Sequence, residues 1–124
     1  MLNQLTISEA AERLRRKEIS ARELMQSCLE QIQRVDGKVK AFLSYDEKDA
    51  LAQADAADKV LQSTDSNTQP LLGIPLGMKD VLAVKDQPCN CSSKILGSFR
   101  SVYDATVVQR LKAAVRDKTD EFKR

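Results

Sequence analysis

The sequence predicts an α/β protein in which several helices accompany a few short strands. Two patterns carry this prediction: hydroxyl–carboxylate capping signatures precede apolar residues at helical spacing, and a mostly apolar run punctuated by glycine and proline occupies the centre of the chain. A composition of 42% apolar and 31% charged residues is typical of an ordinary globular protein. The 124 residues have room for about one domain.

A hairpin of two helices is predicted at the N-terminus. The capping box Thr6–Glu9 starts a helix that runs to about Arg16, and Ser20–Glu23 repeats the signature before a second helix. The second helix carries one apolar stripe, made of Leu24, Cys28, Leu29, Ile32 and Val35. Gly37 is expected to end it in a left-handed conformation.

The middle of the chain predicts strand, helix, loop and strand in that order. Ala41–Tyr45 is a short β-like run, and Asp46 is expected to cap a third helix. The buried side of that helix is rich in alanine: Ala50, Leu51, Ala54, Ala57 and Leu61. The polar stretch Ser63–Gln69 lacks periodicity and predicts a surface loop. A buried strand is predicted over Ile74–Lys79, with Pro75 at its start, where a missing N–H is tolerated.

The C-terminal third predicts a loop, a helix and a tail. Gln87–Arg100 is loop-like, and Asp104 is a candidate N-cap for a last helix with an inner side of Ala105, Val108, Leu111 and Ala114. We expect the folded portion to span residues 1–115. The charged tail over residues 116–124 is expected to fray.

The composition excludes several kinds of site. Without histidine the chain builds no Ser-His-Asp or Cys-His site and no histidine-ligated zinc site. A net charge of +2 and 4% aromatic residues argue against a dedicated nucleic-acid surface. The odd set Cys28, Cys89 and Cys91 favours reduced thiols and a cytoplasmic location. The Cys-x-Cys pair has too few further ligands for zinc, so we interpret it as two small loop residues. No secretory signal or membrane-spanning stretch is recognisable.

Lys79 is the strongest candidate for chemistry. A lysine at the end of an apolar strand is held by a rigid element and partly desolvated, which favours a neutral amine able to act as a general base. The alternative is structural: Lys79 pairs with Asp80, or it reaches solvent from the strand end. The pair Ser92 and Ser93 offers a possible nucleophile, although two serines in a polar loop are usually only part of the loop.

The motifs resemble those of the amidase-signature family. The segment PLLGIPLGMKD at Pro70–Asp80 is specific for that superfamily. CSSKIL at Cys91–Leu96, followed by YDATVVQRLKAA at Tyr103–Ala114, is most similar to the amidase subunits of the aspartyl/glutamyl-tRNA amidotransferases within it. The resemblance covers about Ile7 to Ala114. It implies a mixed sheet covered by helices, present here as the N-terminal portion of an incomplete amidase-signature fold.

The resemblance also implies a role for Lys79. By motif match Lys79 is the base of a Ser–cis-Ser–Lys triad that activates a serine nucleophile against the side-chain amide of glutamine. In the family both serines and the oxyanion-binding backbone lie downstream of the helix matching Tyr103–Ala114. Neither Ser92 nor Ser93, which precede that helix, corresponds to them. The resemblance therefore implies a chain that is inactive alone, because triad members act as a unit.

The implied partners belong to a heterotrimeric complex. Ammonia released from glutamine passes to a B-type subunit, which uses ATP and magnesium to amidate Glu-tRNA(Gln) or Asp-tRNA(Asn), and a C-type subunit completes the complex. In this chain no metal or cofactor site is expected, and tRNA is expected to bind only through the complex. Two alternatives remain open: a non-catalytic interaction module derived from the family, and a portion of another amidase-signature hydrolase. A Ser/Gly-rich segment encoded after Arg124 would favour the amidase over the interaction module.

Overall fold

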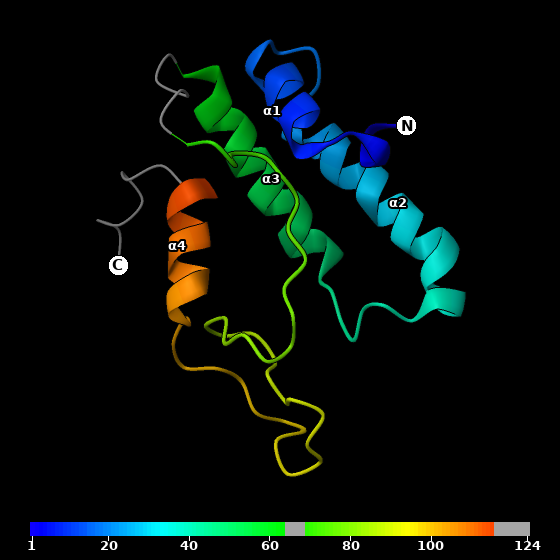
Figure 1. The fold of residues 1–124 in the computed structure, drawn as a ribbon, viewed down its shortest axis with the longest axis vertical. Helices are drawn as coiled ribbons and strands as arrows, with labels where there is room; N and C mark the ends of the chain where they lie inside the picture. Colours follow the sequence, from blue (N-terminus) through cyan, green and yellow to red (C-terminus); the bar gives the residue numbers. More distant parts are fainter. Residues whose placement is uncertain (64–68, 116–124) are drawn as a thin grey trace. The chain divides into compact units, whose positions relative to one another are not determined.

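The computed structural model describes residues 1–63 and 69–115, which fall into two compact units. The first unit comprises Met1–Pro75 together with the chain from Ala114, and the second comprises Leu76–Ala113. The described helices are the 3-10 turn η1 (Leu2–Gln4) and the α-helices α1 (Ile7–Arg15), α2 (Ala21–Val39), α3 (Glu47–Gln62) and α4 (Thr106–Val115) (Figure 1). None of these helices is long and apolar enough to cross a membrane. The expected fraying tail at 116–124 and most of the expected loop at 63–69 lie outside the described residues.

The helix starts in the first unit confirm the capping predictions. Thr6 and Glu9 form a capping box on α1, in which the Thr6 N–H donates to Glu9 Oε2 at 2.8 Å. Ser20 and Glu23 do the same for α2, with the Glu23 N–H donating to Ser20 Oγ at 3.0 Å. The Asp46 carboxylate caps α3 by accepting from the Asp49 N–H at 3.0 Å. Each start therefore follows from residues within one turn of it.

A carboxylate from α3 completes the N-terminus of α2. Asp58 accepts from the backbone N–H of Ala21 at 2.6 Å and from that of Arg22 at 3.1 Å. Together with the capping box, these bonds satisfy the N–H groups that the first turn of a helix leaves without intrahelical partners. The positive end of the helix dipole also favours a carboxylate at this position. The two bonds link residues that are 37 and 36 positions apart in the sequence. They join α2 and α3, which run side by side in opposite directions (Figure 1).

The core of the first unit lies between α1, α2, α3 and the chain after α3. Its buried residues include Leu14 from α1, Leu24 from α2 and Leu61 from α3, and the alanines predicted on the inner side of α3 join them at Ala54 and Ala57. Gly73 lies against this core with a φ of +79°, and a Cβ there would sit 3.1 Å from Ala21 Cβ. Leu72 and Ile74 on either side of Gly73 are themselves buried.

The second unit contains most of α4 and a largely irregular chain. The segments around Gln87 and Ser101 pair locally: the Asp86 N–H donates to the Ser101 carbonyl at 2.8 Å and the Ser101 N–H to the Gln87 carbonyl at 3.0 Å. Ser101 is 2% exposed, and its hydroxyl donates to the Tyr103 carbonyl at 2.8 Å. Asp104 connects this part to α4, since its carboxylate accepts from Lys112 Nζ at 2.8 Å and from the Lys85 N–H.

The predicted mixed sheet is wrong for the part of the chain that the structure describes. Neither Ala41–Tyr45 nor Ile74–Lys79 forms a strand, and the described residues contain one isolated antiparallel bridge, between Pro88 and Arg100. A strand exists only when its N–H and C=O groups pair with a neighbouring strand. Within 1–63 and 69–115 the N–H groups of Leu76–Lys79 make no hydrogen bond. Of these two runs only Ile74 is buried, and neither run has a neighbouring strand to pair with, so the described architecture is helical.

The predicted end of α2 is also wrong. Gly37 is helical, α2 continues to Val39, and Lys40 takes the left-handed conformation with a φ of 54°. The Lys40 N–H donates to the Asp36 carbonyl at 2.8 Å, and the Ala41 N–H donates to the Asp36 carboxylate at 2.7 Å. Because Asp36 caps the following residues with its side chain, the helix ends three residues later than glycine alone indicates.

Candidate functional site

Lys79 lies in the second unit, at the first position of a turn. The Lys79 carbonyl accepts from the Leu82 N–H at 2.9 Å, so the backbone of the lysine is held by a local bond. The residue is exposed, contrary to the partial burial expected of a strand end. Its ammonium group forms no ion pair or hydrogen bond with other described residues, so of the two structural alternatives the pairing with Asp80 is absent there, whereas Lys79 does face solvent. The amine is therefore open to a further group.

Asp80 is bound to the loop that carries the cysteines. Its carboxylate Oδ1 accepts from the Asn90 N–H at 3.3 Å, and its backbone carbonyl accepts from Cys89 Sγ at 3.0 Å. Carboxylate Oδ2 is buried and has no hydrogen-bond partner within the described part of the chain. Asp80 thus anchors the segment next to the candidate base. The sequence marked Asp80 only as a possible ion-pair partner of Lys79.

Ser92 and Ser93 lie in a tight turn organised by Asn90. The Asn90 side-chain oxygen accepts from the Ser92 N–H at 3.0 Å, and the Asn90 carbonyl accepts from the Ser93 N–H at 2.8 Å. This is an Asx turn, a common local structure of polar loops. No hydrogen bond joins either serine to Lys79 in the described residues, so the structure does not bring together a lysine–serine pair. The asparagine between the two cysteines is the residue from which this turn could have been predicted.

The two cysteines of the second unit lie close together. Their Sγ atoms are 3.9 Å apart, and Cys89 is buried whereas Cys91 is exposed. Burial raises the pKa of the Cys89 thiol, and the neighbouring Cys91 adds to the increase. In residues 1–63 and 69–115, no group of three or more Cys, Asp and Glu side chains is placed to hold a metal ion.

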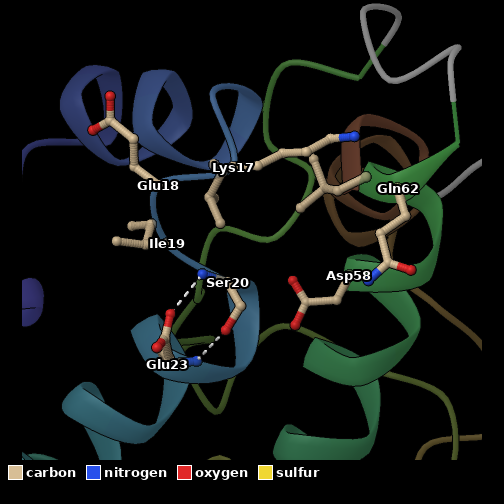
Figure 2. A pocket seen from close by; sticks show the side chains of 9 residues that line it. Lys17, Glu18, Ile19, Ser20, Glu23, Asp58 and Gln62 are labelled. Atoms are coloured by element: carbon tan, nitrogen blue, oxygen red, sulfur yellow. Dashed lines mark hydrogen bonds between the residues drawn. The ribbon is translucent and has the colours of Figure 1, made fainter.

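A shallow hollow of about 300 Å³ in the first unit adjoins the connection between α1 and α2. Figure 2 shows that Glu23 and Ser20 bond to each other's backbone beside it, with Asp58 approaching from α3. Asp58 and Glu23 already accept from the N–H groups of α2. Because both carboxylates already bind N–H groups at the start of α2, we interpret them as part of the helix cap and not as ligand-binding groups of the hollow.

The family comparison covers most of the chain. The amidase family matches residues 23–115. The A-type subunit of glutamyl-tRNA(Gln) amidotransferase from Desulfotalea psychrophila is 52% identical over 111 residues, which are 90% of this chain and 22% of that protein. The protein of the same name from Roseiflexus sp. is 49% identical over 114 residues, 92% of this chain and 23% of that protein. The chain thus spans less than a quarter of the length of these relatives.

A solved structure has a similar fold over most of this chain. It comes from work on a vestigial protein complex and the evolutionary origins of an s-triazine catabolic enzyme. It matches with a TM-score of 0.80 and 32% identity, over 89% of this chain and 24% of the solved chain. The helical architecture described above therefore recurs as part of a much longer protein.

Proposed function

The chain belongs to the amidase family, and from this premise we propose that it carries the N-terminal part of the A-type subunit of a tRNA-dependent amidotransferase. The observation that supports this most is the 52% identity over 90% of the chain to a protein of that name. That stretch includes the segment Pro70–Asp80 with the candidate base. The proposed reaction is hydrolysis of the glutamine side-chain amide, which supplies ammonia for the amidation of a misacylated tRNA.

In this proposal Lys79 is the general base. Its amine takes the proton of the nucleophilic serine through a bridging serine, and the nucleophile attacks the amide carbonyl carbon of glutamine. The C–N bond breaks as that proton passes to the nitrogen, ammonia leaves, and water then hydrolyses the acyl-serine to release glutamate. The exposed amine without a partner among the described residues is compatible with a group that receives the bridging serine from elsewhere. Both serines and the oxyanion donors come from the remaining amidase fold. Under this proposal we expect the 124 residues by themselves to release no ammonia.

The partners follow from the same proposal. B- and C-type subunits complete the complex, glutamine is the amide donor, and tRNA is bound through the complex rather than by this chain. ATP and magnesium act on the B-type subunit. We propose a cytoplasmic location, or an organelle that makes protein, because the tRNA substrates are found there.

Complementation in trans tests the proposal. The chain is mixed with a polypeptide that carries the Desulfotalea psychrophila relative beyond its matched segment, and glutamine-dependent ammonia release is measured. We expect no release from the chain alone and release from the mixture. Lys79→Ala is expected to lower the rate of the mixture by at least about a thousandfold, because a triad fails when any member is removed. Lys85→Ala, which removes another exposed lysine of the same unit, is the matched control and leaves the rate unchanged.

Two results contradict the proposal. One is ammonia release by the chain alone that persists through purification and disappears in Lys79→Ala. The other is release by the mixture that is equal in wild type and Lys79→Ala.

A non-catalytic interaction module is the second candidate function, and the surface of the second unit supports it. Ile95 is 94% exposed, Val102 74% and Tyr103 62%. Large exposed apolar side chains mark surfaces that bind other proteins when they form one contiguous patch. Tight binding of the complementing polypeptide without ammonia release favours this function over the first.

A further inference from the structure

The sulfur atoms of Cys89 and Cys91 lie in non-bonded contact with each other. They are 3.9 Å apart, against the roughly 2.05 Å of a disulfide bond. Cys91 and Ser92 both have positive φ values, 51° and 61°, so the chain bends at this point. Non-glycine residues with positive φ are uncommon and occur where local structure requires them. Here the bend accompanies two side chains, separated by one residue, whose sulfurs lie close together.

The two thiols differ in a way that suits stepwise oxidation. Cys91 is exposed and open to a reagent in solution, whereas Cys89 is 7% exposed and donates to the Asp80 carbonyl at 3.0 Å. An accessible first thiol with a protected neighbour is the arrangement of an attacking and a resolving cysteine. Cys28 belongs to α2 in the other unit and takes no part in this pair.

We infer that Cys89 and Cys91 form a reversible intramolecular disulfide by exchange with glutathione disulfide or a similar small disulfide. The Cys91 thiolate attacks one sulfur of glutathione disulfide, the glutathione S–S bond breaks, and one glutathione leaves. The Cys89 thiolate then attacks the Cys91 sulfur of the mixed disulfide and the second glutathione leaves. The two protons lost by the cysteines go to the two glutathione thiolates, so the two cysteines are oxidised by two electrons and glutathione disulfide is reduced by two.

Oxidation changes the anchoring of Asp80. The reduced Cys89 thiol is the donor to the Asp80 carbonyl, and a disulfide sulfur has no hydrogen to donate. Closing the sulfurs also moves the loop whose Asn90 N–H donates to the Asp80 carboxylate. The disulfide therefore releases Asp80, the residue next to Lys79, from the cysteine loop. This inference concerns thiol chemistry alone and does not depend on the proposed amidase reaction.

The test uses the full chain in buffers of glutathione and glutathione disulfide. Thiols are blocked with an alkylating agent in acid, and trypsin then releases the peptide Asp86–Lys94, which contains both cysteines. In wild type we expect this peptide to be lighter by two hydrogen atoms and to carry no glutathione. Cys89→Ser is expected to retain glutathione on Cys91. In Cys91→Ser, the buried Cys89 is expected to react at least about tenfold more slowly than Cys91 does in Cys89→Ser. Cys28→Ser is the matched control and behaves as wild type.

Three results overturn the disulfide: a fully reduced peptide, glutathione on both cysteines, or disulfide-linked dimers in place of the internal bond. A second measurement tests the release of Asp80 separately. Amide hydrogen exchange of Asn90, followed by NMR, is expected to be at least about threefold faster in the oxidised chain, because its acceptor is lost. Equal exchange in the two forms overturns the release.

Discussion

Two glycine-to-alanine substitutions test the packing of the first unit with the same chemical change at two sites. Gly73 has a φ of +79°, and a Cβ there would lie 3.1 Å from Ala21 Cβ, 3.2 Å from Leu14 Cδ1 and 3.4 Å from Leu61 Cδ1. Gly37 lies within α2, where a Cβ would have no atom within 4 Å. We expect Gly73→Ala to destabilise the chain and Gly37→Ala to stabilise it.

The magnitude follows from three contributions. At Gly73 the left-handed backbone costs an alanine about 1–2 kcal/mol. Crowding against side chains that are 0% and 2% exposed, Ala21 and Leu14, adds about 1–3 kcal/mol. The lower entropy of the unfolded chain returns about 0.4–1 kcal/mol, so the net loss is about 1–5 kcal/mol. At Gly37 the helix propensity of alanine adds up to about 1 kcal/mol of stability.

Urea unfolding followed by circular dichroism at a helical wavelength measures both changes. We expect the midpoints to move in opposite directions and the two free energies of unfolding to differ by about 1–6 kcal/mol. Where Gly73→Ala alone is too unstable to measure, the double variant with Gly37→Ala recovers a folded baseline. Equal shifts of the same sign in the two variants would show that the close approach of Gly73 to α1, α2 and α3 is wrong.

Three further predictions concern the same unit. Asp58→Asn removes the charge that accepts from the first two N–H groups of α2 and should lower the free energy of unfolding by about 1–2 kcal/mol. Asp55→Asn breaks only the exposed ion pair with Arg22 and should cost less than about 1 kcal/mol in the same urea titration, so a larger loss in Asp55→Asn contradicts this account. The Thr6 N–H holds the pKa of Glu9 below its usual 4.5, so this stabilisation is present above pH 4.5 and is lost as the pH falls through the lower folded value. The advantage of wild type over Glu9→Gln in helix stability should therefore shrink in acid, and a constant difference from pH 6 to pH 3 refutes it. Leu14→Ala removes most of a side chain that is 2% exposed and should lower the free energy of unfolding by about 3–5 kcal/mol. Ile7→Ala, at a residue 58% exposed, should change the urea midpoint little. Similar midpoints in the two variants refute the assignment of Leu14 to the core.

The candidate site shows why a motif is easier to identify than its geometry. The motif predicts that Lys79 is the base, and the described residues contain no contact that tests this role. The proposed reaction takes its two serines from elsewhere in the amidase fold, so no local pattern in these 124 residues would position them. The contacts of Asp80 with Cys89 and Asn90 join residues that are nine and ten positions apart. They depend on the path of the loop between these residues, and no residue spacing in the sequence predicts them.

The sequence by itself determined where α1, α2 and α3 begin, because a capping residue and its helix lie within one turn of each other. Thr6, Ser20 and Asp46 each accept from a backbone N–H three residues later, as predicted. The alanine-rich inner side of α3 was likewise readable, since helical periodicity alone selects the residues that share a face.

Only the tertiary structure decided what the apolar centre of the chain becomes. An apolar run indicates that a segment is suited to burial, but a strand also needs a neighbouring strand for its hydrogen bonds. The described residues place no neighbouring strand beside Ile74–Lys79. The same holds for the glycines: Gly37 remains helical because Asp36 caps the chain beyond it, and Gly73 is required because three helices approach it closely. In each case the deciding contact comes from outside the local pattern, which is why sequence periodicity could not supply it.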